Sequence, residues 1–274
     1  MSGILYIIGT PIGNMEDITL RQMRLLEEVD FICAEDTRVT LKLLNRCEIK
    51  NELVSFHEHS SKSEAQRIID RILSGQNCGV VTDAGMPCIS DPGEVLVRMC
   101  YENGIDVRVV PGPTAAASAA ALSGLHINRF TFEGFLPVPK KERQERLELL
   151  RNETAVMIFY EAPHKLKNTL ADMVDFFGGE RRIAICREIT KLHEEVIRFT
   201  LSEAVEYYNT TEPRGEFVLV LEGKNTADSE EITLEQAMEQ VKRLIEKGEK
   251  PTEACKAVAK ETGFRKSELY AALQ

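Results

Sequence analysis

The sequence contains no long apolar run, and this absence sets the first limits on the protein. No stretch reaches the ~18 to 20 uninterrupted apolar residues that a membrane-spanning helix needs. The first ten residues are too short for a secretory signal peptide and lack its basic start. We therefore expect a cytoplasmic protein. Since 43% of the 274 residues are hydrophobic, the chain can bury cores in about two domains, which excludes a disordered or fibrous protein.

Paired cysteines are also absent. The seven cysteines are dispersed and form no C-x-x-C pair, which is typical of reduced structural thiols rather than of a disulfide framework or a zinc site. His57 and His59 form a His-x-His pair that could bind a metal, but no Cys or Asp-rich partner stands at ligand spacing. We predict no metal site, and we favour substrate contact or local hydrogen bonding for these two side chains.

Basic residues are in the minority. The 34 Lys and Arg stand against 44 Asp and Glu, which leaves a net charge of -10. This balance excludes a protein that coats nucleic acid with its whole surface, but it permits a local basic cleft. The segment from Thr233 to Gln274 differs, because its eight Lys/Arg and seven Asp/Glu give it a charge of +1 against -11 for the rest.

Short apolar runs alternate with amphipathic segments through the first half of the chain, which is typical of an α/β domain. We predict strands at 5–9, 31–34, 53–56, 78–82 and 107–110. Helices are expected at 19–29, up to 44, at 61–73 and 91–102, and from Pro113 onward. We interpret 107–110 as an apolar strand of a parallel sheet covered on both faces.

The second half has more strands and fewer helices between them, which indicates a mixed sheet. Strands are expected at 130–135, 155–160, 183–187, 196–200 and 217–222, with helices at 140–151 and 165–177. The stretch 125–129 is the candidate junction, so we predict an N-terminal α/β domain over 1–124 and a second over 125–224. Ligand clefts commonly lie at such junctions.

Three loops rich in glycine and small residues follow predicted strands of the first sheet: 9–14, 82–93 and 111–117. Each alone resembles an ordinary turn, but together they converge on the edge where such sheets bind ligands. None is the G-x-G-x-x-G fingerprint, so a nicotinamide site has little support. Asp83 could accept hydrogen bonds from an amine or a ribose hydroxyl, whereas we interpret Asp91 as a helix cap.

Charged clusters follow other strand ends, at 35–38, 160–165 and 187–195. Substrate contact and a solvated patch of salt bridges are both compatible with these runs.

The motifs resemble, in order over nearly the whole chain, those of the bacterial 16S ribosomal RNA cytidine 2′-O-methyltransferase family, which has the tetrapyrrole methylase fold. The most specific are Gly9-Thr-Pro-Ile-Gly-Asn14 and Ala34-Glu-Asp-Thr-Arg38. The other matching segments are 5–8, 16–19, 56–59, 82–93, 111–115, 160–164, 187–195 and 215–220.

The resemblance implies a two-domain α/β protein that binds S-adenosylmethionine between its domains, forms a homodimer, and methylates the ribose 2′-hydroxyl of a cytidine in the decoding region of the small-subunit RNA. The residues it implies at the methyl donor are Pro11, Asp83, Ala84, Gly85, Ile89, Thr114, Ala115, Tyr160, Glu161 and Ala162.

Methyl transfer from a sulfonium mainly requires alignment, and a base or cation that favours the ribose alkoxide would help. We hypothesise that charged residues at the strand ends do this catalytic work; they are Asp36, Arg38, Lys191 and Glu194. The catalytic base itself is not identified. Two alternatives stay open: a small-molecule methyltransferase of the same fold, and a non-catalytic donor-binding module that regulates a partner.

The C-terminal segment reads as a polar linker at 224–231 followed by three helices, at 234–247, 252–261 and 266–273. The helices resemble a small helix-turn-helix unit whose third helix would present Arg265 and Lys266. A solvated appendage is the alternative, but we favour an RNA-docking role for 225–274 because this is the one clearly less acidic segment.

Overall fold

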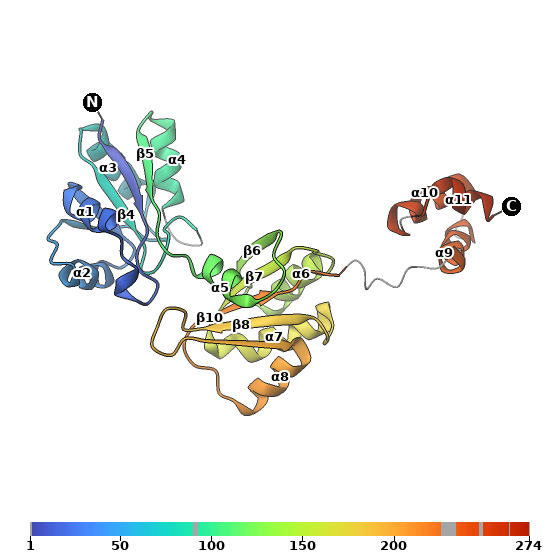
Figure 1. Ribbon diagram of the computed structural model, residues 1–274. Coiled ribbons are helices and arrows are strands. Elements are labelled where there is room, and N and C mark those ends of the chain that lie inside the picture. Colours follow the sequence, from blue (N-terminus) through green and yellow to red (C-terminus); the bar gives the residue numbers. More distant parts are fainter. Residues whose placement is uncertain (1, 90–92, 226–233, 247–248, 263, 274) are drawn as a thin grey trace. The chain divides into compact units, whose positions relative to one another are not determined.

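The structure, a computed structural model, describes residues 2–89, 93–225, 234–246, 249–262 and 264–273. The chain divides into two compact units, Met1–Gly223 and Lys224–Gln274. The first unit contains two five-stranded sheets with helices on their faces, as Figure 1 shows. The predicted α/β class is confirmed.

The first sheet is entirely parallel, with the strand order β3-β2-β4-β1-β5. Its strands are β1 (Ile4–Ile8), β2 (Phe31–Ala34), β3 (Leu53–Ser55), β4 (Cys78–Val81) and β5 (Asp106–Val110). Its helices are α1 (Leu20–Glu28), α2 (Thr37–Arg46), α3 (Lys62–Leu73) and α4 (Glu94–Glu102). Apolar side chains of α1 and α2 pack on one face of the sheet, and those of α3 and α4 on the other.

Capping boxes explain where two of these helices begin. The hydroxyls of Thr19 and Ser61 accept from backbone N–H groups in the first turns of α1 and α3, and Gln22 and Glu64 reach back to the capping residues. Helix α4 begins at Glu94, with Gly93 at the N-cap position, so it is shorter than predicted. Asp91, interpreted as its cap, lies outside the described residues.

The interpretation of residues 107–110 as a strand covered on both faces is wrong. β5 is the edge strand, and four of its five residues are exposed. Val107 and Val109 are 36% and 55% exposed, and Arg108 between them breaks the apolar run. An edge strand has a neighbour on one side only, so its apolar residues need not be covered.

The second sheet is mixed, as predicted, with the order β6-β7-β10-β8-β9. Its strands are β6 (Phe130–Phe135), β7 (Val156–Glu161), β8 (Arg182–Arg187), β9 (Glu195–Thr200) and β10 (Phe217–Leu221). One face packs against α6 (Lys140–Leu150), α7 (Pro163–Phe177) and α8 (Leu201–Thr210). Helix α8 was not predicted, although Thr200 and Glu203 form a capping box at its start.

The other face of this sheet is covered by α5 (Ala115–Ser123), the helix that follows the last strand of the first sheet. Ala119 and Ala120 are buried there against residues of β7, β8 and β10. From β9, Arg198 donates to the carbonyls of Ser123 (2.7 Å) and Leu122 (2.5 Å) at the end of α5. Helix α5 therefore shares its core with the second sheet, and a domain boundary after residue 124 stays a prediction.

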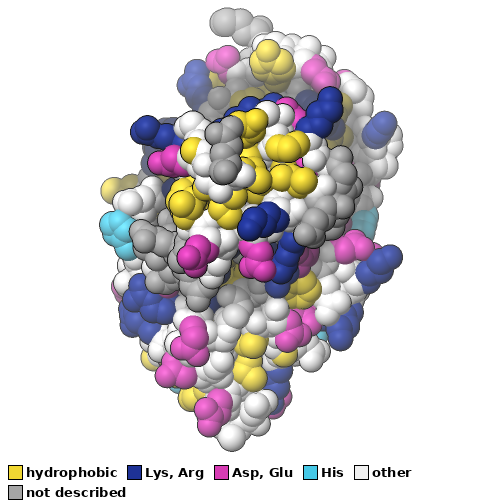
Figure 2. All heavy atoms as spheres, turned by 90° about the vertical axis from the view of Figure 1, so that its right-hand side faces the viewer, with side chains coloured by type: hydrophobic (Ala, Val, Ile, Leu, Met, Phe, Trp, Pro, Cys, Tyr) yellow, Lys and Arg dark blue, Asp and Glu magenta, His cyan; other side chains and the backbone are white. Residues whose placement is uncertain are grey.

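The C-terminal unit has a small core of its own. Its helices are α9 (Leu234–Glu246), α10 (Pro251–Thr262) and α11 (Lys266–Ala271), close to the predicted spans. Val241, Val258 and Leu269 are buried between them. Most of the predicted linker at 224–231 lies outside the described residues. Figure 2 shows one face of the whole chain, on which basic and acidic side chains are interspersed.

The seven cysteines, all within the described residues, form no disulfide, and five of them are buried. No helix in the described part of the chain combines the length and the apolar character needed to cross a bilayer.

Candidate functional site

The loops after β1, β4 and β5 meet at the carboxyl edge of the first sheet. Thr10 and Gly85 exchange two backbone hydrogen bonds, of 2.8 and 3.1 Å, and the Gly9 N–H donates to the Val110 carbonyl at 3.0 Å. A Cβ on Gly9 would lie 2.7 Å from the Cα of Gly112, so neither loop has space for a side chain at this contact. The sequence prediction that these loops converge is confirmed.

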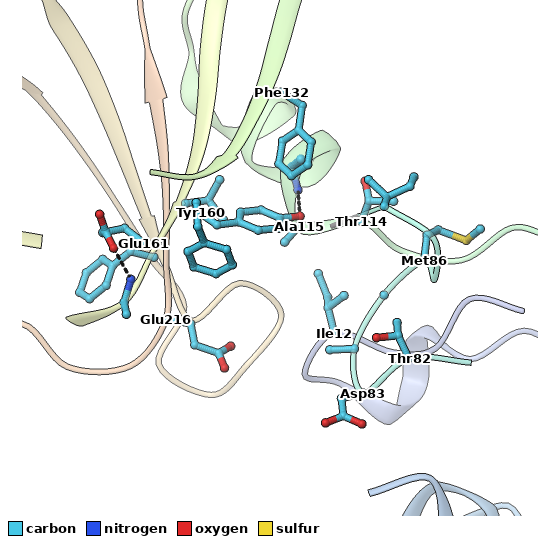
Figure 3. Close-up of a pocket in the computed structure, with 18 of the residues that line it drawn as sticks. Ile12, Thr82, Asp83, Met86, Thr114, Ala115, Phe132, Tyr160, Glu161 and Glu216 are labelled. Atoms are coloured by element: carbon cyan, nitrogen blue, oxygen red, sulfur yellow. Dashed lines mark hydrogen bonds between the residues drawn. The ribbon is translucent and has the colours of Figure 1, made fainter. Parts of the chain in front are cut away.

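A cavity of about 740 Å³ opens between this edge and the second sheet. Figure 3 shows the two contributions. The loops of the first sheet and the start of α5 supply Ile12, Glu35, Thr82, Asp83, Ala84, Gly85, Met86, Ile89 and residues 114–117. The second sheet and the start of α7 supply Phe130, Phe132, Phe135, residues 160–164 and residues 216–218.

The two walls differ chemically. The first wall is poor in side-chain bulk, so a ligand there approaches backbone groups. The second wall is aromatic, since the Tyr160 ring meets those of Phe132 and Phe135 edge-on, at centroid distances of 4.9 and 5.6 Å. The two walls are joined where the Ala116 N–H donates to the Tyr160 hydroxyl at 3.2 Å.

Carboxylates give the cavity an acidic character. Burial and the neighbouring Glu35 raise the pKa of Asp83 above its usual range. Glu35 itself accepts a 2.6 Å hydrogen bond from the Thr82 hydroxyl. Glu161 is almost fully buried and accepts from the Thr169 hydroxyl (2.5 Å) and the Ala162 N–H (2.8 Å). Clustered acids of this kind suit a ligand that carries positive charge.

Nine of the ten residues expected at the methyl donor line this cavity. The exception is Pro11, which directly precedes the lining residue Ile12. The structure thus brings together side chains from loops more than 140 positions apart in the sequence, as the resemblance implied. Contact with the donor itself stays a prediction.

The four residues expected to assist catalysis lie outside the cavity wall. Asp36 forms an exposed ion pair with Arg38 at 2.6 Å, and this hydrogen-bonded guanidinium lowers the pKa of Asp36 to about 2. The backbone N–H of Asp36 donates to the lining residue Asp83 at 3.2 Å. This pair is therefore one hydrogen bond away from the cavity.

Lys191 is connected to the opposite side of the cavity. Its ammonium group donates to Glu188 and to the lining residue Glu216, both at 2.8 Å. Partial burial opposes charging of Lys191, but these two carboxylates outweigh it and raise the pKa of the lysine. Glu194 accepts from the Thr190 N–H at 2.6 Å and so holds the same loop.

Several lining residues were not singled out from the sequence as site residues. They include Glu35, Met86, Phe130, Phe132, Phe135, His164 and Glu216. A recurring phenylalanine, as in Phe-Thr-Phe-Glu-Gly-Phe, was the available signal for the aromatic wall, but an apolar strand gives the same pattern when it is simply buried.

No group of three His, Cys, Asp or Glu side chains among the described residues is arranged to hold a metal ion. His57 and His59 lie in the loop after β3, are exposed, and have ring centroids 6.2 Å apart.

The sequence matches one protein family and several named bacterial relatives. Residues 4–205 match the family model described as tetrapyrrole (corrin/porphyrin) methylases. A Bacillus subtilis protein named ribosomal RNA small subunit methyltransferase I is 46% identical over 272 residues, covering 98% of this chain and 93% of its own length. A protein of the same name from Thermotoga maritima is 48% identical over 222 residues, which are 81% of this chain and 99% of its own length.

Solved structures agree on the fold. The X-ray structure of a cobalt precorrin-4 methyltransferase covers 80% of this chain and 94% of its own length, with a TM-score of 0.60 and 19% identity.

Proposed function

Because the chain belongs to the tetrapyrrole (corrin/porphyrin) methylases, and within them to the ribosomal RNA small subunit methyltransferase I group, we propose that it methylates the ribose 2′-hydroxyl of a cytidine in the decoding region of 16S ribosomal RNA. The observation that carries this proposal is near-full-length similarity to relatives of that name, in a chain whose donor motifs line one cavity. We include a cytoplasmic location in the proposal, because the proposed substrate is ribosomal RNA.

The methyl donor is S-adenosylmethionine, and the cavity has the features that this cation requires. Asp83 and Glu35 provide negative charge near the first wall, and the loops at Gly85 and Thr114 leave room for a ligand against the backbone. Tyr160, Glu161 and Ala162 would hold the donor from the second sheet. When bound, the donor supplies the methyl group, and the remainder of the donor leaves as a neutral thioether.

The chain's task is then to align the acceptor oxygen and to favour loss of its proton. Positioning of this kind can supply several kcal/mol of the barrier. Asp36 and Lys191 each hydrogen-bond a residue that lines the cavity, Arg38 pairs with Asp36, and Glu194 holds the loop of Lys191. We assign these four residues to orienting the RNA and adjusting the local potential. Replacing each by Ala should reduce turnover far more than donor affinity, and unchanged turnover would remove that residue from the assignment.

We include a homodimer in the proposal. The edge strand β5 exposes Val107 and Val109, and Tyr101 at the end of α4 is 86% exposed. An apolar sheet edge is a common surface for association between chains. Val109→Lys should then shift the wild-type dimer towards monomer in analytical ultracentrifugation; a protein that sediments as a monomer before the substitution contradicts this part.

The proposal also gives the C-terminal unit a role in docking RNA. Arg265 and Lys266 are exposed at the start of α11. The eight Lys/Arg and seven Asp/Glu of 233–274 give this segment a charge of only +1, which favours a supporting role over a dominant electrostatic one. The Thermotoga maritima relative, which covers only 81% of this chain, leaves about fifty residues without a counterpart, the size of this unit. We therefore assign it to substrate affinity and not to the chemical step.

The decisive experiment is transfer of labelled methyl from S-adenosylmethionine to purified small ribosomal subunits from a strain lacking this gene, followed by nucleoside analysis. We expect label in a 2′-O-methylated cytidine, and none with subunits from the parent strain, whose site is already methylated. Donor binding without label in RNA would favour a small-molecule acceptor. Label in a base would retain the RNA substrate but overturn the ribose assignment.

A further inference from the structure

We propose that Phe135 is the platform on which the base of the acceptor nucleotide stacks. This inference rests on the proposed function and names a specificity-determining contact within it. Its starting point is that Phe135 lines the cavity and is nevertheless 58% exposed. Phe130, on the same strand, also lines the cavity and is 45% exposed.

An irregularity in β6 places Phe135 on the cavity side. In a regular strand, residues 130, 132 and 134 share a face. Here the register with β7 shifts between Phe132 and Gly134, so that Phe130, Phe132 and Phe135 pair with Val156, Ile158 and Tyr160. Without this bulge a glycine would occupy the position of the Phe135 ring.

The bulge is anchored from the opposite face of the sheet. The side chain of Glu133, the residue left without a partner in the register, is almost fully buried and forms an ion pair with Arg146 of α6. Gly134 follows with a φ of +63°, a backbone conformation that favours glycine. The orientation of Phe135 is therefore built into the strand.

The aromatic ring beneath Phe135 is also fixed in position. The Tyr160 ring is held by the hydrogen bond from Ala116 to its hydroxyl and by edge contact with Phe132. Phe135 packs edge-on against this ring at 5.6 Å. A flat ligand that covers Phe135 thus meets a preorganised aromatic surface, which lowers the entropic cost of binding.

The position of Phe135 in the sheet distinguishes an acceptor base from the donor. β6 is the edge strand of its sheet, and Phe135 is 58% exposed, whereas Tyr160 and Glu161 of the neighbouring strand β7, which are assigned to the donor, are half-buried and buried. For the ribose of a nucleotide in RNA to reach a methyl donor bound inside this cavity, the nucleotide has to turn out of its strand and enter from the open side, with the rest of the RNA chain remaining outside. Exposed aromatic side chains commonly receive such unstacked bases.

A cycle of two changes tests the contact. Small subunits are reconstituted with 16S RNA that carries either cytosine or an abasic ribose at the target position, and single-turnover methylation is measured with wild type and Phe135→Leu. Leucine keeps an apolar side chain but removes the aromatic face. We expect each change alone to slow methylation about tenfold, and the two together to be no slower than either, because both remove one interaction.

Four controls separate this contact from other roles. Phe135→Tyr, which keeps the ring, should retain wild-type rates, and Val138→Ala should do so as an exposed apolar neighbour outside the cavity wall. The donor Kd of Phe135→Leu, measured calorimetrically without RNA, should equal that of wild type. Its sedimentation should also be unchanged.

The outcomes that overturn the assignment are distinct. Unchanged methylation by Phe135→Leu, or losses that multiply in the cycle, would show that the ring does not contact the base. Weakened donor binding would assign Phe135 to the donor, and altered sedimentation would assign it to an interface between copies. If wild type methylates no ribosomal RNA, the proposed function fails, and this assignment fails with it.

Discussion

At the scale of single residues, the cavity depends on positions where a side chain is absent. Gly9 and Gly112 bring the first and third loops into backbone contact, and Gln22 of α1 donates to the Gly9 carbonyl at 2.8 Å. A methyl group at Gly9 would collide with Gly112 and with the Met86 sulfur, both within 2.8 Å. The glycine is therefore required by packing between loops.

Gly9→Ala should lower the free energy of unfolding by about 1 to 3 kcal/mol, the usual cost of overpacking, and should weaken donor binding. Urea denaturation and donor calorimetry measure the two effects. Gly104→Ala is the matched control, since a Cβ there meets no atom within 4 Å and the cost is limited to its positive φ of 66°. Equal donor affinities for the two variants would contradict the role of the Gly9 contact.

The environment of Asp83 disfavours the charged form of this carboxyl group when no ligand is bound. Burial and the charge of Glu35 raise its pKa, so the folded state binds this proton more tightly than the unfolded chain does. As pH rises through the ordinary value of 3.8 and beyond the raised one, the folded state loses stability, and the loss persists at neutral pH. The carboxylate is retained at the expense of stability.

Asp83→Asn should accordingly raise the melting temperature at neutral pH while weakening S-adenosylmethionine binding. The gain should shrink as the pH is lowered through the raised pKa, and it should vanish below the ordinary value of 3.8, where the wild-type group is protonated in both states. Asp36→Asn is the control, because Arg38 lowers the pKa of Asp36 and its loss should bring no gain. Thermal melts across this pH range measure the melting temperatures of both variants. A lower melting temperature for Asp83→Asn than for wild type at neutral pH would refute the argument.

At the scale of secondary-structure elements, the second sheet owes its helical cover to polar as well as apolar contacts. Arg143 of α6 and Asp172 of α7 form an ion pair at 2.7 Å, with side chains only 13% and 9% exposed. Removing one partner of such a pair leaves the other charge buried. The interface between α6 and α7 is thus sensitive to a single substitution.

Asp172→Asn should cost about 3 kcal/mol in the free energy of unfolding, measured in urea, because the Arg143 guanidinium loses its counter-charge. The matched comparison is Glu28→Gln, which breaks the exposed pair between Arg24 and Glu28, also at 2.7 Å, and should change stability by at most about 0.5 kcal/mol. Similar losses in the two variants would show that burial does not govern the strength of these pairs.

At the scale of the whole molecule, the two compact units have different roles in the proposed function: the first holds the cavity and the second docks RNA. All residues that line the cavity belong to Met1–Gly223, and α9, α10 and α11 enclose a separate core. A chain ending at Gly223 should therefore keep its melting temperature and donor Kd. At physiological salt its KM for small subunits should rise several-fold with little change in kcat; an unchanged KM would remove the docking role.

Much of this organisation could be predicted from local sequence. Apolar runs located all ten strands of the described residues to within one residue, and polar residues before amphipathic segments located helix starts, as at Thr19 and Ser61. The exposed β5 was misjudged because its three valines were interpreted as an apolar run, although Arg108 interrupts them. Helix α8 was missed because it directly follows β9 without a glycine or proline between them.

The sequence by itself determined the alternation of strands and helices, the three side-chain-poor loops and the family, because each is expressed in neighbouring residues. Tertiary structure alone decided that α5 covers the second sheet, that a bulge at Glu133 presents Phe135 to the cavity, and that Lys191 reaches Glu216. Those features depend on which distant surfaces pack together. Burial, register and charge pairing across long separations are properties of the folded chain.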